Sequence, residues 1–459
     1  MILNLKYKKF NSAKSFFFTF IQRNNVTILI LILFCVWATK IIYKDLQFSP
    51  DKGIPSAESR LNADFANDFH TSVYFRASQM LKGQEMNVLV IHPGYVDSAS
   101  GQLFPLLFSP FLNFFHPDRY VSYFFFLCTT LIIFIIFYTL LMKKNEKEIL
   151  NGGLIFLFAF FLSVPGFIGI YMGNIDIILA PIVGILVLLV LGSIKKEKIS
   201  IIRIIITSIL AGAMINAKIF LLLFALITVF FSKRKFLTGI VAIATFFTLI
   251  YIPNIFSSQS SPFLFFNKII NWDNLVPFSN NLWANHSLYA TATIFTDCVK
   301  TNTCETQPVN ALITLALFLF IFLTPFLLYK PIKKITINKN IYFSVMKLRK
   351  SKEFALVLIV LAVAFINLAF KVVYDYRLFY SVIITLILLK ESAAIKKATV
   401  YCYLSMFSLL IGGIWALRLS PDEPWTIDAR PLKFFIIFHF FFLILSALTY
   451  WKESQKKQL

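Results

Sequence analysis

Two carboxylates stand four residues apart in the polar stretch 62–83, which reads NADFANDFHTSVYFRASQMLKG. On a helix, Asp64 and Asp68 share one face, because residues four positions apart are neighbours there. A carboxylate within hydrogen-bond reach of a hydroxyl can serve as a general base. Asp68 also precedes an apolar periodic run, so the type of residue suits a helix N-cap equally well. Both roles are compatible, and we expect the acid–base chemistry of the chain at this pair.

Basic side chains stand at the ends of apolar segments, where they could meet a phosphate. Lys218 separates two apolar segments, and Lys371 and Arg377 bracket the sequence KVVYDYR. Ionisable groups at membrane depth are costly and tend to face cavities or partners, and cations of this kind suit a phosphate. Two alternatives stay open. Lys218 could snorkel to the nearer interface, and Asp375 could pair with Lys371 or Arg377.

Other polar side chains stand at similar places and are expected to contact a substrate. His286 follows Asn285 in the sequence WANHSL, and we expect it to bind a phosphate or to hydrogen-bond a sugar. His92, before a proline, is either a loop residue or a site residue. The expected substrate-binding residues are Tyr74, Arg76, His92, Asn174, Asp176, Asn285 and Tyr376.

The elements that position these residues must be membrane helices. Of the 459 residues, 58% are hydrophobic and 14% are charged, against about 25% charged in soluble domains. A soluble fold cannot bury so much apolar surface, so soluble, disordered and disulfide-scaffold classes are excluded. We expect one all-α integral membrane domain over 1–459 with twelve apolar segments. They are 26–43, 119–141, 150–170, 175–193, 199–217, 218–231, 236–256, 309–328, 354–370, 377–390, 398–418 and 432–451.

Two regions leave alternatives open. The neighbouring segments 199–217 and 218–231 are either two short helices or one tilted helix with a break. The apolar stretch 103–115 contains two prolines and is expected to be re-entrant or interfacial. The stretch 62–83 is expected to form an amphipathic helix on the membrane surface.

The net charge of +22 gives the orientation. Most of the 44 Lys and Arg lie in alternate loops between the apolar segments, on one side. The positive-inside rule therefore places both termini in the cytoplasm, and it accounts for the basicity without nucleic acid. The two long loops, 45–118 and 257–308, then lie outside, and long loops often carry function.

Metal and nucleotide motifs are missing from the sequence. It contains no Walker A loop, no Gly-rich dinucleotide fingerprint, no His-Glu-x-x-His and no zinc-like Cys/His spacing. We expect no cofactor and no metal. Cys298 and Cys304 enclose a short loop on the oxidising side, which predicts a structural disulfide.

The order of several short motifs resembles glycosyltransferase family 87. After an N-terminal segment come Asp68-Phe69 opening the amphipathic stretch and the run FPLLFSP, then GNID, AKIFLLL, NHSL and YDYR. The likeness spans about 62–380. The sequence departs from the family at FPL, at Gly173-Asn174 and at Asn285-His286-Ser287, which bears on the donor sugar and the acceptor more than on the fold.

The resemblance implies a C-type glycosyltransferase fold and a polyprenol-phosphate-mannose-dependent mannosyltransferase acting outside the membrane. Asp68 matches the position of the family's general base, with Asp64 as the nearby alternative. His286 and Lys218 fall where the family presents polar or basic groups to the donor. We expect a hexosyltransferase of the bacterial cell envelope, in the inner membrane, with a lipid or glycan acceptor. The alternatives are a glycan polymerase or ligase, and a flippase or transporter of lipid-linked saccharides.

Overall fold

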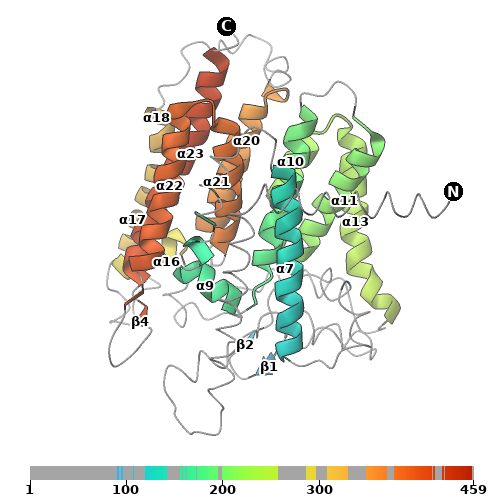
Figure 1. The fold of residues 1–459 in the computed structure, drawn as a ribbon, viewed down its shortest axis with the longest axis horizontal. Helices are drawn as coiled ribbons and strands as arrows, with labels where there is room; N and C mark the ends of the chain where they lie inside the picture. Colours follow the sequence, from blue (N-terminus) through green and yellow to red (C-terminus); the bar gives the residue numbers. More distant parts are fainter. Residues whose placement is uncertain are drawn as a thin grey trace, which may run out of the picture.

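A computed structural model gives the fold as a bundle of helices running in roughly the same direction (Figure 1). The structure describes residues 90–92, 95–96, 107, 119–141, 153, 156–157, 159–161, 163–171, 173–194, 199–256, 286–295, 308–328, 348–369, 377–415, 417–418, 426–427 and 429–456. The predicted helix 62–83, the stretch 103–115 apart from Leu107, and most of both long loops lie outside these residues.

The described part of the chain is almost entirely helical and strongly apolar. Four helices are long and apolar enough to cross a membrane: Tyr123–Leu141, Asp176–Ile194, Asn310–Leu328 and Pro431–Lys456. Three shorter apolar helices accompany them, namely Ile201–Ala217, Ile219–Phe231 and Lys235–Tyr251. This confirms an α-helical membrane protein.

The helices follow one another in the order of the predicted segments. Their bounds are α7 Arg119–Leu141, α9 Val164–Tyr171, α10 Asp176–Ile194, α11 Ile201–Ala217, the 3₁₀ turn η4 Ile219–Leu221, α12 Leu222–Phe231, α13 Lys235–Phe256, α16 Leu288–Phe295, α17 Pro308–Phe318, the π-helical η8 Leu319–Leu323, α18 Thr324–Leu328, α20 Lys352–Leu368, α21 Leu378–Ser392, α22 Lys396–Trp415 and α23 Ala429–Lys456.

Two very short antiparallel strand pairs interrupt the all-helical pattern. Strand β1, Val90–His92, pairs with β2, Tyr95–Val96, and β3, Leu417–Arg418, pairs with β4, Thr426–Ile427. The prediction of an all-α fold holds for the bundle and misses these two hairpins. His92 forms the end of β1, opposite Tyr95.

Helix α21 is the buried centre of the bundle. It packs against α10, α20, α22 and α23, and its residues 378–390 are all buried. Helix α7 also packs against α10. At that contact, a Cβ added to Gly184 would lie 2.5 Å from the Phe137 ring and 2.6 Å from Ile383 Cγ2, so only a glycine permits this close packing.

The segments 199–217 and 218–231 form a helical hairpin. Lys218 has an extended backbone, with φ −151° and ψ 119°, and this ends α11. Arg203, near the start of α11, lines one recess together with Ser232, just after α12. The two helices therefore run antiparallel, with Lys218 at the reversal, which decides for two short helices over one broken helix.

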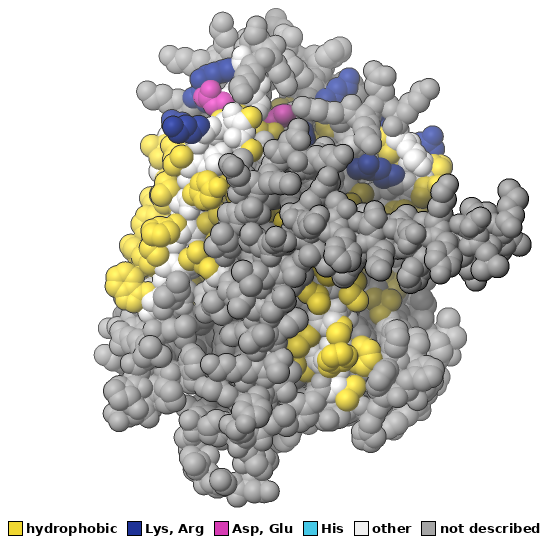
Figure 2. Space-filling view, viewed as in Figure 1, with side chains coloured by type: hydrophobic (Ala, Val, Ile, Leu, Met, Phe, Trp, Pro, Cys, Tyr) yellow, Lys and Arg dark blue, Asp and Glu magenta, His cyan; other side chains and the backbone are white. Residues whose placement is uncertain are grey.

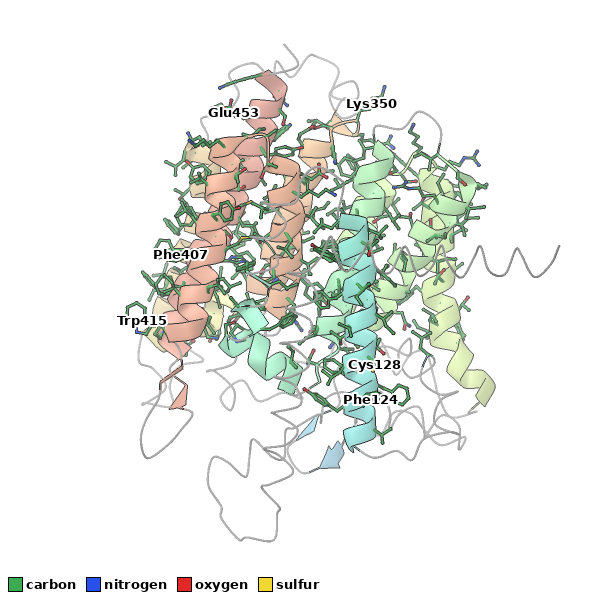
Figure 3. All side chains as sticks on the ribbon, in the orientation of Figure 1. Phe124, Cys128, Lys350, Phe407, Trp415 and Glu453 are labelled. Carbon is green, nitrogen blue, oxygen red and sulfur yellow. The ribbon has the colours of Figure 1, made fainter. Side chains whose placement is uncertain are left out.

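Charged and apolar side chains separate along the bundle. Figure 2 shows Lys, Arg, Asp and Glu gathered at one end, above a band of hydrophobic side chains. We call this end the basic end; it carries Lys233, Arg234 and Lys235 after α12, and Lys350 before α20. Figure 3 labels Lys350 and Glu453 there, and Phe124 and Trp415 toward the opposite end.

Exposed large hydrophobic side chains cover the outer helices, including Ile132 on α7, Ile202 on α11, Ile243 on α13 and Leu312 on α17. These faces suit lipid, because an apolar exterior of this extent has no stable contact with water. The side chains that face inward include many polar ones, such as Asp176, Asn216, His286 and Lys433. Polar groups inside an apolar shell must be satisfied by one another or by a bound group.

Candidate functional site

The start of α10 is built by a tight local turn at the end opposite the basic end. Gly173 has φ 65°, a left-handed conformation that favours glycine. The turn lets Gly173 N–H donate to Ile170 O (3.1 Å) and Asn174 N–H to Gly169 O (2.9 Å). The side chain of Asn174 then accepts from Asp176 N–H at 2.9 Å. Asp176 is thereby fixed at the positive end of the α10 dipole.

Asp176 is fully buried and joins two helices. The Tyr380 hydroxyl, on the first turn of α21, donates to Asp176 Oδ1 at 2.8 Å. The other oxygen, Oδ2, is buried and has no hydrogen-bond partner among the described residues. Asp176 was predicted to bind substrate from its place at a segment end. Tyr380 was missed, because a tyrosine within an apolar segment looks like ordinary core.

The ring of Phe220, a residue of the hairpin, contacts both Tyr380 and Arg377. The Phe220 ring packs edge-on against Tyr380, with centroids 5.9 Å apart and planes at 88°. Cζ of Arg377 lies 4.3 Å from the centre of the same Phe220 ring. A guanidinium this close to an aromatic face is attracted by the ring quadrupole. Arg377 and Tyr380 are three positions apart, so both emerge from the first turn of α21.

The Arg377 side chain makes no hydrogen bond and no ion pair with the described residues, and its Nε is buried. The ring of Phe220 holds its position without consuming its N–H donors. A cation kept in this way has donors available for an anion. Asp375, its alternative partner, and Lys371 lie outside the described residues.

Lys218 lies at the reversal of the hairpin, two residues before Phe220. Its side chain is buried, with 7% of its surface exposed, which disfavours the snorkelling alternative. Its carbonyl accepts from Leu221 N–H at 3.0 Å and so starts η4. The extended backbone at Lys218 thus carries both the lysine and Phe220 into the interior.

Three segment ends that looked separate in the sequence therefore meet. Asn174 and Asp176 come from α10, Lys218 and Phe220 from the hairpin, and Arg377 from α21. We call these residues together with Tyr380 the Arg377 cluster. The distance along the helices from it to the basic end is about 20 Å, because thirteen residues of α21 separate Arg377 from Lys390.

His286 lies at the start of α16 and is fully buried. Its Nε2 is 3.2 Å from Asn367 Oδ1. Since Asn367 Nδ2 donates to Val363 O at 2.9 Å, Oδ1 is the acceptor and Nε2–H of His286 is the donor. Ser287 caps α16 by accepting from Ala290 N–H at 3.1 Å. His286 thus has a structural partner on α20, which the sequence did not indicate.

A second buried histidine was missed in the sequence. His439 on α23 has Nε2 2.9 Å from Ser381 Oγ and Nδ1 2.8 Å from Ser405 Oγ. Ser381 Oγ donates to Leu378 O at 2.7 Å, so it can accept from Nε2–H of His439. The Ser405 hydroxyl in turn lies 3.0 Å from His439 O, to which it can donate. The histidine joins α21, α22 and α23. A histidine inside the apolar run FHFFF was the signal that could have identified it.

Of the remaining predicted residues, the structure describes only His92. His92 is described as part of β1 through its backbone. The others lie outside the described residues: Asp64, Asp68, Tyr74, Arg76, Asn285, Cys298, Cys304, Lys371 and Tyr376.

The Arg377 cluster can hold an anion next to a buried carboxylate. It contains the guanidinium of Arg377, the carboxylate of Asp176 and the hydroxyl of Tyr380, which the Phe220 ring connects, and the buried Lys218 lies two residues before Phe220. Within the described residues, no group of three His, Cys, Asp or Glu side chains is placed to hold a metal ion. The described side chains of the cluster can supply electrostatic stabilisation and hydrogen bonding.

Comparison of the chain with known protein families, with curated protein sequences and with solved structures finds no significant match in any of the three.

Proposed function

We propose that this protein is a membrane glycosyltransferase that moves a hexose from a polyprenyl-phosphate donor to a hydroxyl of a lipid or glycan acceptor. The observation that carries the proposal is the placement of Arg377 on the face of Phe220, a residue of the hairpin whose reversal carries the buried Lys218. A guanidinium inside an apolar bundle that makes no ion pair with the described carboxylates suits the phosphate of a lipid donor.

The orientation follows from the charges. The basic end faces the cytoplasm by the positive-inside rule, so the Arg377 cluster lies toward the outer leaflet of a bacterial inner membrane. Both long loops, 45–118 and 257–308, then lie on the same side as the cluster. This orientation supports the proposal of a C-type glycosyltransferase fold, in which the two loops would lie above the site.

The reaction that we propose is a single displacement with inversion at the anomeric carbon. Asp68 removes the proton from the acceptor hydroxyl, and that oxygen forms a bond to C1 of the sugar. The bond from C1 to the phosphate oxygen breaks, and the polyprenyl phosphate leaves with the electron pair. Arg377 and Lys218, assisted by Lys371, offset the negative charge that grows on the leaving phosphate.

Purified protein in lipid vesicles, with a radiolabelled polyprenyl-phosphate mannose and a native lipid extract, tests the proposal. Transfer of label to a new product is expected, and Asp68→Asn should abolish it with unchanged expression. Asp97→Asn, in the same loop, is the matched control and should retain transfer. Normal transfer by Asp68→Asn would refute the assigned base.

The product distinguishes the two alternatives. Label that moves across the vesicle membrane on its original carrier, with no new product, would establish a flippase. A ladder of lengthening saccharides would establish a polymerase. The glycosyltransferase proposal requires a single defined addition per acceptor.

A further inference from the structure

A second group of polar residues lies at the basic end, away from the Arg377 cluster. A small recess opens there between α10, α11 and the turn that joins α12 to α13. Its walls carry the hydroxyls of Ser193, Thr207, Thr228, Ser232 and Thr238. Arg203 and Lys233 supply its positive charge, and we call it the Arg203 recess. About 20 Å along α11 separates it from Lys218, so the two sites are distinct.

Arg203 is held in place by one of its nitrogens. Its Nη2 donates to Leu189 O at 2.9 Å, near the end of α10. Gly192 gives it room, because a Cβ on that residue would lie only 2.6 Å from Nη2. The Nε of Arg203 is buried and has no hydrogen-bond acceptor among the described residues. Residues 199–256 contain no Asp or Glu at all.

Most hydroxyls around the recess have already used their hydrogens. Ser193 donates to Val190 O at 2.6 Å, Thr207 to Arg203 O at 2.7 Å, and Thr228 to Phe224 O at 2.8 Å. These bonds are internal to their helices and fix the side chains.

The remaining pair of hydroxyls, those of Ser232 and Thr238, has one hydrogen that their mutual bond does not use. Ser232 Oγ and Thr238 Oγ1 lie 2.6 Å apart, and either can donate to the other. Ser232 Oγ also accepts from Arg234 N–H at 3.3 Å. Two hydroxyl hydrogens share one mutual bond, so one hydrogen is left to donate elsewhere. Together with Arg203 Nε–H, the recess therefore offers donors and positive charge, and an anionic oxygen is the complement of both.

The size and surroundings of the recess indicate which kind of anion can bind there. The recess is partly open, and its cavity volume is about 20 Å³, room for one oxygen-sized group. A whole soluble metabolite does not fit. The exposed apolar side chains of Ile202 on α11 and Phe236 on α13 flank this level of the bundle, and acyl chains can lie against them.

We propose that the Arg203 recess binds a phosphate oxygen of an anionic phospholipid headgroup in the leaflet at the basic end. Basic pockets between membrane helices at this level are suited to such headgroups. Arg203 Nε and the Ser232–Thr238 pair bind the oxygen that enters the recess, and Lys233 neutralises the charge at its mouth. The lipid thereby joins α10, α11 and α13 at the point where the hairpin begins and ends.

The test measures lipid binding by native mass spectrometry and thermal unfolding of the full chain in a neutral detergent. Added phosphatidylglycerol should bind and raise the Tm, and phosphatidylcholine should not. Arg203→Lys keeps the charge but loses the planar donor set, and should bind phosphatidylglycerol about tenfold more weakly. Lys233→Gln, at an exposed residue, should weaken binding several-fold and keeps the test valid if the arginine variant does not fold.

Controls separate this site from other sources of binding. Lys397→Gln removes an exposed cation at the same end and should bind like the unmodified chain. Equal binding by Lys233→Gln and Lys397→Gln would overturn the proposal. So would the same rise in Tm from inorganic phosphate alone, because it would show that no lipid is required.

Discussion

The phenolic hydroxyl of Tyr380 donates a hydrogen bond of 2.8 Å to Oδ1 of Asp176, although 204 positions separate the two residues in the chain. Both side chains are buried. The bond connects the first turn of α21 to the first turn of α10. It therefore fixes the distance between the helix that carries Arg377 and the helix that carries Asn174.

Tyr380→Phe should destabilise the fold. The substitution leaves both oxygens of the Asp176 carboxylate without a donor from α21, which we expect to cost about 1–2 kcal/mol. Thermal unfolding in detergent measures the loss as a lower Tm. Tyr403→Phe, at a tyrosine on the outer face of α22 with 42% of its surface exposed, is the control and should leave the Tm unchanged. An unchanged Tm for Tyr380→Phe would show that the bond does not hold the two helices together.

Phe220→Leu should weaken donor binding and preserve the fold. Leucine keeps the apolar volume but removes the ring that faces Arg377 at 4.3 Å, and a cation–π contact is worth about 1 kcal/mol, or roughly fivefold in affinity. We expect KM for the polyprenyl-phosphate donor to rise by about that factor. The matched control is Phe236→Leu at the basic end, where 82% of the side chain is exposed. A KM that does not change would mean that Phe220 has no part in holding Arg377 for the donor.

His439→Ala should lower stability by about 2–4 kcal/mol, since it removes two buried hydrogen bonds and leaves a cavity. The affected helices are α21, α22 and α23, which meet at this side chain. Phe407→Ala, at a side chain with 62% exposure on α22, controls for the loss of an aromatic-sized group. Unfolding in a denaturant series checks both. Equal losses from the two variants would rule out a specific role for the His439 hydrogen bonds.

We expect opposite changes in Tm when Gly212 and Gly239 are each replaced by alanine. A Cβ on Gly212 would lie 2.2 Å from the Ala242 carbonyl oxygen, so α11 and α13 would have to move apart. A Cβ on Gly239 would meet nothing within 4 Å, and alanine there should add up to about 1 kcal/mol through helix propensity. We expect Gly212→Ala to lower the Tm and Gly239→Ala to keep or raise it. A neutral Gly212→Ala would contradict the close helix contact.

The sequence predicted the positions of elements well where hydrophobicity alone determines them. The segment 119–141 is α7, and 175–193 differs from α10 by one residue at each end. Polar residues at segment ends, such as Asp176 and Arg377, were visible because charge interrupts an apolar run. Asp176 and Arg377 come together in one cluster because the helix ends that carry them lie at the same level of the bundle.

Pairings inside the apolar segments were not predictable. Tyr380, Ser381 and His439 each lie within a hydrophobic run, and the identity of their partners depends on how helices distant in the sequence rotate against one another. Hydropathy indicates which residues lie within the membrane, but it does not indicate how each helix is rotated about its own axis. For the same reason, we predicted from the sequence that His286 binds a ligand and did not predict its bond to Asn367.

The hairpin at Lys218 has a consequence for the bilayer itself. Helix α11 has 17 residues, and η4 with α12 has 13, so the two arms are about 25 and 20 Å long, against a hydrocarbon thickness of about 30 Å. A pair of arms this short is mismatched to the hydrophobic slab, and thinning of the bilayer is one way in which such a mismatch is relieved. Thinning beside the hairpin would bring water and headgroups closer to the level of Lys218. A carrier phosphate would reach its cations with little penetration into the apolar layer.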